Sequence, residues 1–401
     1  MPNRSDRRSL LIMFCVLLFV VCGTYIVSIL ARGYRLNLKS GPIIQATGIL
    51  SATSQPKSAS VFINDRLTTA TDDVMNLAPG DYNIKITKDG YLPWQKNISI
   101  KKEVVYQTEA ILFRSVPELS PITQSGAINP TLSPDGSKII FAVASASASR
   151  DNGLYIIETS DNLIPLTKNT PRQIATNYPG IDWSKAIFTF SPNSRQLLSK
   201  FETKDHHYLL PLDSTITEKN LVDVTSQLDS ITAEWQINEA QIIQSRLDRL
   251  PPEIKAVAST ESAHHLSFNS KEDKVIYLAK TDNTLPANII TPPPAQSTQI
   301  QSRQIKTDNY YVYDLKDDTN FLLGTKSNYS EPLWLPNSSY IIYIEDNSIK
   351  AVDYDGTNKL TLFAGNFHQN VYFPWSDGSR LITLTSVYNG APENLYSISL
   401  K

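Results

Sequence analysis

The stretch Leu132–Phe141 reads LSPDGSKIIF, a tight polar turn followed directly by a run of hydrophobic residues. The same phrase returns as FSPNSRQLL at 190–198, as WLPNSSYIIY at 334–343 and, one residue shorter, as WSDGSRLI at 375–382. Proline sets φ at the first turn position, Asp or Asn bonds the backbone ahead of it, and Gly or Ser relaxes the exit. Each copy therefore predicts two antiparallel strands joined in a fixed register.

Weaker copies of the phrase begin at Trp235 and Phe268, which brings the number of copies to six. Their spacing averages about 49 residues, which is typical of propeller blades with four strands. A four-stranded sheet has two apolar faces and has to stack against its neighbours. We therefore predict an all-β fold with a six-bladed β-propeller over residues 117–401, or seven blades if the long first interval hides a degenerate copy.

This repeat region resembles the propellers of the TolB and WD40-like group, over about 270 residues. The resemblance implies a ring of sheets whose loops offer a concave face to partners. We expect the segment from Ile111 to Ile122 to close the ring by pairing with the last blade.

A hydrophobic segment near the N-terminus, Leu10–Ala31, contains no charged residue. At about 1.5 Å rise per residue, a helix of this length covers the roughly 30 Å hydrocarbon core of a bilayer. We therefore predict a transmembrane helix at 10–31, a cytoplasmic tail at 1–9 and a linker at 32–42. A cleaved signal peptide and a lipidated Cys22 are the alternatives. Three basic residues flank the segment on each side, so charge alone does not decide its orientation.

Residues 43–113 have a different character, because short alternating strands replace the hydrophobic run. Tyr82, Ile84 and Ile86 alternate with polar residues, which places the apolar side chains on one face of a strand. Turn residues such as Pro79-Gly80 and Lys88-Asp89-Gly90 separate the strands. The segment therefore predicts a small, separate β domain.

The motifs of this small domain resemble the PEGA domain family, β-sandwich modules of bacterial envelope proteins. The matching positions are Gly48, Leu50, Ser54, Pro56, Ala59-Ser60-Val61, Ile63-Asn64-Asp65, Leu77-x-Pro79-Gly80-x-Tyr82 and Lys88-x-Gly90-Tyr91. Two positions depart from the family pattern, because Ser58 replaces a glycine and Thr71-Asp72 replaces the usual Thr-Pro. The resemblance implies a domain at residues 43–113 that lies outside the cytoplasm and associates with the surface or the cell wall.

Two groups of residues are candidate contacts for a ligand or partner. Tyr91 and Trp94 present exposed rings that stack on a sugar, or alternatively Tyr91 packs over its own turn. The Pro-rich stretch 283–308 is expected to be an exposed loop, which either docks a partner or is a tolerated insertion. Its candidate contact residues are Pro292, Pro293 and Pro294.

Signals of catalysis are missing from the sequence. The nucleophile-elbow, zinc-protease and phosphate-loop motifs are all absent. The His pairs at 206–207 and 264–265 point to opposite faces of a strand, so neither pair can hold one ion by itself. Asp353–Asn358 looks like a calcium loop but lacks the following Glu, and a structural turn explains it better. We therefore expect no catalytic residue, no cofactor and no metal.

The charges of the chain nearly balance, with 37 Lys and Arg against 39 Asp and Glu, and they give no basic surface for nucleic acid. Both cysteines, Cys15 and Cys22, lie in the hydrophobic segment. We expect a single-pass membrane protein with its C-terminal domains outside the cytoplasm. Its expected role is non-enzymatic, as a binding or scaffold protein of the bacterial cell envelope that contacts a wall polymer, a glycan or a partner protein. The alternative is a propeller-based glycan hydrolase or lyase that uses carboxylates from several blades.

Overall fold

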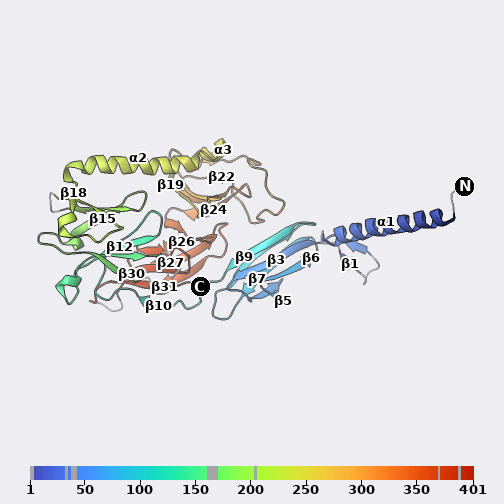
Figure 1. Ribbon diagram of the computed structural model, residues 1–401, viewed down its shortest axis with the longest axis horizontal. Coiled ribbons are helices and arrows are strands. Elements are labelled where there is room, and N and C mark those ends of the chain that lie inside the picture. The colour runs from blue at the N-terminus through green and yellow to red at the C-terminus, as the bar shows by residue number, and fades with distance from the viewer. Residues whose placement is uncertain are drawn as a thin grey trace. The chain divides into compact units, whose positions relative to one another are not determined.

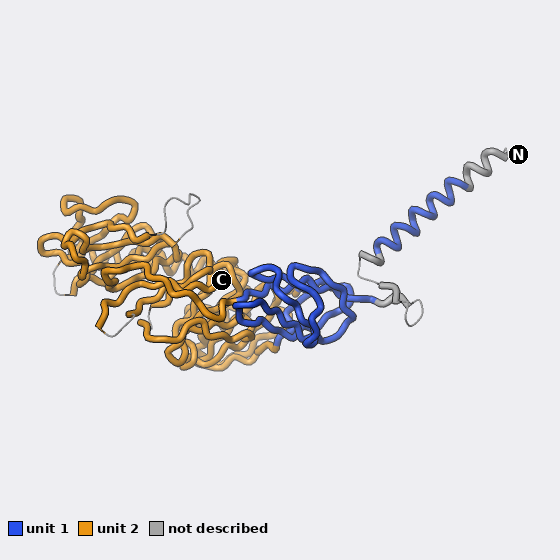
Figure 2. Tube along the Cα trace, turned by 90° about the horizontal axis from the view of Figure 1, so that it is seen from below, with its two compact units in different colours: residues 1–112, 293–299 blue, residues 113–292, 300–401 orange. Residues whose placement is uncertain are grey.

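The computed structural model describes residues 4–31, 35–37, 43–159, 170–202, 206–368, 371–386 and 390–401. Strands predominate, as expected of an all-β fold. The chain divides into two compact units, which Figure 2 shows in different colours. The first unit comprises residues 1–112 and 293–299, and the second comprises residues 113–292 and 300–401.

The N-terminal helix α1 spans Arg4–Ala31 and includes the hydrophobic segment. Within the described residues, no helix is both long enough and apolar enough to cross a membrane. Strands β1 (Arg35–Asn37) and β2 (Ile43–Gln45) form an antiparallel pair after this helix.

The small β domain of the first unit contains two sheets. In the first, β3 (Gly48–Gln55) lies between β6 (Asp73–Leu77), which is antiparallel to it, and β9 (Val105–Ile111), which is parallel. The second has the order β5-β4-β7-β8, with β5 at Arg66–Ala70, β4 at Ser60–Ile63, β7 at Gly80–Thr87 and β8 at Trp94–Ile100. Both sheets bury apolar side chains, among them Leu50, Ile84 and Ile86. The alternation predicted for β7 is therefore confirmed.

The second unit is built from four-stranded antiparallel sheets, and its described residues form five of them (Figure 1). The first two contain β11 (Ile128–Leu132), β12 (Lys138–Val143), β13 (Gly153–Glu158) and β14 (Arg172–Thr176), then β15 (Ala186–Phe190), β16 (Gln196–Phe201), β17 (Tyr208–Pro211) and β18 (Val222–Asp223). The next two contain β19 (Ala263–Phe268), β20 (Lys274–Ala279), β23 (Asn309–Asp314) and β24 (Thr319–Thr325), then β25 (Ser330–Trp334), β26 (Tyr340–Glu345), β27 (Ser348–Asp353) and β28 (Leu360–Ala364). The last contains β29 (Tyr372–Pro374), β30 (Arg380–Thr385), β31 (Asn394–Ser399) and β10 (Leu119–Pro121).

Shorter elements connect the sheets. They are the hairpin β21 (Asn283–Thr284) and β22 (Gln304–Ile305), the 3-10 turns η1 (Ser149–Asp151), η2 (Trp183–Lys185), η3 (Glu218–Asn220) and η4 (Thr225–Gln227), and the helices α2 (Leu228–Leu247) and α3 (Pro252–Lys255). Both helices lie in the chain between β18 and β19.

The repeated phrase forms the turn between the first and second strand of every one of these five sheets. In each turn, a backbone N–H bonds the carbonyl five residues later at 2.8 to 3.0 Å. The pairs are Ser133 to Lys138, Ser191 to Gln196, Asn269 to Lys274, Leu335 to Tyr340 and Trp375 to Arg380. Gly136 and Gly378 occupy the left-handed position of their turns, with φ of 70° and 68°. The turn chemistry predicted from the sequence is confirmed in five copies.

The sixth copy, at Trp235, is wrong, because this residue lies in the middle of helix α2. The stretch after it contains no Pro or Gly, and Ala, Glu and Gln favour a helix there. The described residues of the second unit form five four-stranded sheets, one fewer than the six predicted blades.

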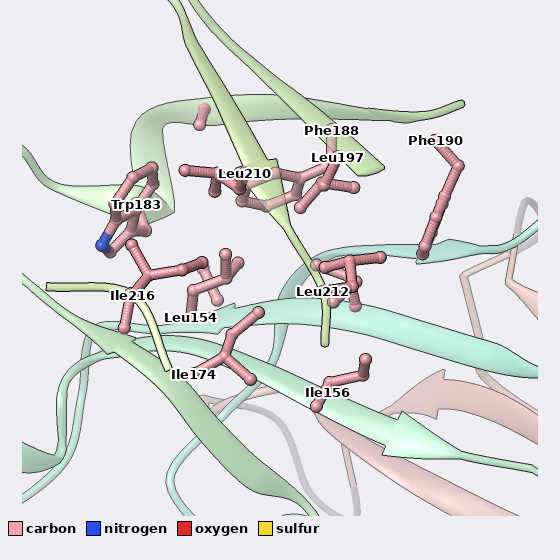
Figure 3. Packing of buried hydrophobic residues seen from close by; sticks show 14 of the residues in the cluster. Leu154, Ile156, Ile174, Trp183, Phe188, Phe190, Leu197, Leu210, Leu212 and Ile216 are labelled. Carbon is pink, nitrogen blue, oxygen red and sulfur yellow. The ribbon is translucent and has the colours of Figure 1, made fainter. Parts of the chain in front are cut away.

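Neighbouring sheets share hydrophobic cores. The β11–β14 and β15–β18 sheets bury one cluster that contains Leu154, Ile156, Trp183 and Leu210 (Figure 3). Similar clusters join β19–β24 to β25–β28, and β29–β31 to β11–β14. Strand β10 pairs with β31, with Leu119 opposite Ile398. The segment expected to pair with the last blade therefore does so.

Candidate functional site

Tyr91 and Trp94, the predicted aromatic contacts, differ in exposure. Trp94 is only 3% exposed, because it begins β8 with its ring in the core, opposite Ile86 on β7. It therefore cannot present an open ring to a sugar, and that prediction is wrong for Trp94. Tyr91 is half-buried beside the Lys88 turn, where its N–H bonds the Lys88 carbonyl at 3.0 Å.

In three sheets of the second unit, the strand that comes first in the chain is irregular. The pairing register shifts within β11, β19 and β25, between Ile128 and Thr131, Ala263 and Leu266, and Ser330 and Leu333. Asn129 and Glu331 adopt left-handed backbone in these bulges, with φ of 51° and 43°. Bulges bend a strand and redirect its side chains, and they are common beside functional sites. The bulges in β19 and β25 therefore define a candidate site.

Four residues form this site, and we call them the His265 cluster: His265 of β19, Tyr310 of β23, Glu331 of β25 and Tyr372 of β29. The rings of His265 and Tyr310 meet edge to face, with 5.8 Å between centroids. The Tyr372 hydroxyl donates to the carbonyl of Ser330 at 3.1 Å and also to that of Glu331. Strands from three consecutive sheets therefore meet at the exposed Glu331 side chain.

The surroundings of His265, Tyr310 and Tyr372 favour the uncharged form of each side chain. Burial lowers the pKa of His265, although the Glu331 charge and the Pro332 backbone oppose this shift. Burial and the same charge raise the pKa of Tyr310 and of Tyr372. His265 Nε2 is buried and has no hydrogen-bond partner among the described residues. Tyr310 and Tyr372 are buried, so Glu331 is the exposed group of this cluster that can accept hydrogen bonds from a ligand.

Metal binding has no comparable geometry in the described part of the chain, where no group of three or more His, Cys, Asp or Glu side chains is placed to hold an ion. The calcium-like loop serves as a turn. Asp355 Oδ1 accepts from the backbone N–H of Thr357 at 3.1 Å and from its hydroxyl at 2.6 Å. These are the hydrogen bonds of a turn, and the interpretation of this loop as a structural turn stays a prediction.

Residues 47–114, which form the small two-sheet domain, match the model of the PEGA domain family. This part of the chain is a PEGA domain. Ser58, which replaces a family glycine, has φ of 57° and so keeps the left-handed backbone that glycine favours. No curated protein shows significant similarity to the chain.

Several solved structures are similar to about 70% of the chain. They include a putative TolB from Agrobacterium tumefaciens (12% identity, 68% of this chain and 78% of the other, TM-score 0.22) and the WD40 repeats of RRP9 (10% identity, 71% and 98%, TM-score 0.30). An oligogalacturonate lyase in complex with manganese is also similar (12% identity, 70% and 68%, TM-score 0.23). The similar structures thus include both groups that the repeat resembles.

The Pro-rich loop, the second predicted contact, leads into the PEGA domain's unit at Pro293. Thr298 Oγ1 donates to the Asn97 carbonyl at 3.2 Å and accepts from the Ser99 N–H at 3.3 Å. Gln299 Nε2 donates to the same carbonyl at 2.6 Å. Residues 293–299 therefore cover part of the open edge of β8, an edge strand. Docking of a separate partner on Pro292, Pro293 and Pro294 stays a prediction.

Sequence reasoning missed the whole His265 cluster. The only local signal was the pair His264-His265, since a histidine on one face of a strand can meet groups from a neighbouring strand. Nothing near Glu331 or Tyr372 distinguishes them in the sequence, because their proximity depends on how consecutive sheets stack.

Proposed function

We propose that this protein is a non-enzymatic binding or scaffold protein of the cell envelope, and that the uncharged hydrophobic sequence at 10–31 anchors it in the membrane, although no described helix meets the length and hydropathy expected of a membrane span. Its domains outside the cytoplasm would contact a wall polymer, a glycan or a partner protein. The PEGA domain supports an envelope setting, because domains of this family associate with surfaces or cell walls. The His265 cluster is the observation that carries the binding role, since it offers neutral polar groups and one carboxylate on rigid strands.

Carboxyl chemistry favours binding over glycan hydrolysis. A hydrolase needs two carboxyl groups about 5 to 10 Å apart, one of them kept protonated by a raised pKa. In the described residues, the His265 cluster holds one carboxylate. The Asp pKa values that depart from normal, at Asp73, Asp135, Asp182, Asp223 and Asp282, are all lowered.

The binding role predicts that the full-length protein, in detergent, is retained by isolated cell-wall polymer or enriches an envelope protein. Replacing Glu331 by Ala is expected to reduce this binding about tenfold, because hydrogen bonds to a charged group contribute roughly 1.5 to 3 kcal/mol. Glu234→Ala on the exposed side of α2 is the matched control and should bind like the wild type. The amount of protein retained measures both effects. If both variants are retained equally, the His265 cluster is not part of the binding site.

The proposed topology can be tested by thiol labelling, since residues 32–401 contain no cysteine. Cys15→Ser and Cys22→Ser provide a thiol-free background, into which Ala240→Cys introduces one exposed thiol on α2. We expect a membrane-impermeant maleimide to label this thiol in intact spheroplasts. Asn3→Cys, in the proposed cytoplasmic tail, should react only after permeabilisation. The reverse pattern would contradict the orientation, and labelling of both thiols in intact spheroplasts would contradict the membrane anchor.

A further inference from the structure

A pocket lies at the β15–β18 sheet. Its residues precede those of the His265 cluster in the sequence. Its volume is about 430 Å³. Its lining includes Ile181, Phe201, His206, Tyr208, Glu218 and Leu221. Apolar and polar side chains thus share the pocket, as is usual for sites that bind small organic ligands.

The apolar wall of the pocket is fixed by the core beneath it. Ile181, Tyr208 and Leu221 pack against the buried cluster of Figure 3. The half-buried ring of Tyr208 meets the edges of Trp183 and Phe201, each with 6.2 Å between centroids and with interplanar angles of 70° and 86°. Trp183 and Phe201 are themselves buried. Tyr208 is therefore a rigid aromatic surface, held in one orientation before any ligand arrives.

The polar wall is also preorganised. His206 Nδ1 lies 2.7 Å from Asp223 Oδ2, so the ring is oriented and a ligand would meet Nε2. Asp223 Oδ1 accepts from the Thr225 hydroxyl at 2.6 Å and from its N–H at 2.9 Å. These bonds, followed by that of His206, lower the pKa of Asp223 to about 2 and keep it ionised. Glu218, which is exposed, is the carboxylate in the pocket lining, and Asp223 acts by orienting His206.

We propose that this pocket binds a pyranose ring that carries no acidic group, as one unit of a glycan. A pyranose has an apolar face that stacks on an aromatic ring, and its hydroxyls donate to carboxylates and to an imidazole nitrogen. The Glu218 carboxylate in the lining disfavours uronic acids and phosphate-linked sugars, because like charges repel. This inference rests on the proposed binding function and names the ligand class within it.

Titration of the full-length protein with short oligosaccharides tests the inference. The protein is kept in a detergent without a sugar headgroup, and calorimetry compares chitohexaose with hexagalacturonate. We expect chitohexaose to bind with a Kd between about 10 µM and 1 mM, the range of a small interface with few anchors, and hexagalacturonate not to bind. Stronger binding of the acidic oligomer would overturn the proposal.

Three variants locate the binding. Tyr208→Ala removes the stacking ring and should weaken chitohexaose binding about tenfold or more, whereas Tyr208→Phe keeps the ring and should bind nearly as well as the wild type. Because Tyr208→Ala also touches the core, the exposed Glu218→Ala provides an independent variant, with an expected loss of about tenfold. Wild-type binding by either alanine variant would place the sugar elsewhere. If the protein retains wall polymer but binds no oligosaccharide, this inference fails while the proposed function stands.

Discussion

Replacing Gly378 by Ala is expected to destabilise the second unit by about 3 kcal/mol or more, one of the two largest effects we predict for a single substitution. Two causes act together. Gly378 has φ of 68°, a backbone conformation that costs a residue with a Cβ about 1 to 2 kcal/mol. A Cβ at this position would also lie 2.3 Å from the Pro336 carbonyl oxygen, in the turn of the neighbouring sheet. Because that atom belongs to the backbone, one turn has to move away from the other.

Gly136→Ala is the matched control for this prediction. Gly136 occupies the same place in its own turn with φ of 70°, but a Cβ there meets nothing within 4 Å. It should therefore show only the conformational cost, about 1 kcal/mol. Thermal and urea unfolding of both full-length variants measures the difference. Equal losses would mean that the close approach of the two turns contributes nothing.

Trp183→Ala is expected to lower the free energy of unfolding by about 3 to 5 kcal/mol, because it leaves a large cavity in the shared core of two sheets. Trp183 is fully buried, and its Nε1 donates to the Thr176 carbonyl at 2.8 Å. Its ring also contacts Phe201 and Tyr208, so its loss removes the support of the proposed sugar pocket. Chitohexaose binding should fall in parallel with stability.

Trp235→Ala is the control for the tryptophan prediction, since Trp235 is half-buried on α2 and belongs to none of the described core clusters. Its expected cost is below about 1 kcal/mol. The midpoint of urea unfolding distinguishes the two variants. Leu247, at the C-terminal end of α2, packs in a buried cluster. A loss of stability at Trp235 as large as that at Trp183 would show that the middle of α2 also makes stabilising contacts.

Local patterns in the sequence predicted much of this fold. The repeated phrase predicted five turns because a short polar side chain and a left-handed residue act within the turn itself, with proline in three of the five. The weaker copy at Trp235 is followed by a stretch without Pro or Gly, and a helix forms there. The turn residues around Gly80 and Gly90 likewise sufficed to recognise the PEGA domain.

Sites were harder to predict than turns. Trp94 looked like a contact residue because aromatic rings bind sugars, yet its position on β8 opposite Ile86 of β7 places it in the core. The pairing of His206 with Asp223 depends on β17 and β18 lying side by side, which adjacent His residues in a sequence do not reveal. The sequence did not show which side chains meet, because strand pairing decides that.

The sequence by itself determined the repeated hairpins, the small PEGA domain and the hydrophobic N-terminal segment, because each depends on interactions between residues close in the chain. Only the tertiary structure decided that the described residues of the second unit form five four-stranded sheets and that His265, Tyr310, Glu331 and Tyr372 form one cluster. These residues come from different strands of three sheets. Their meeting depends on stacking between sheets, which is governed by shape and burial over long distances and leaves no local pattern in the sequence.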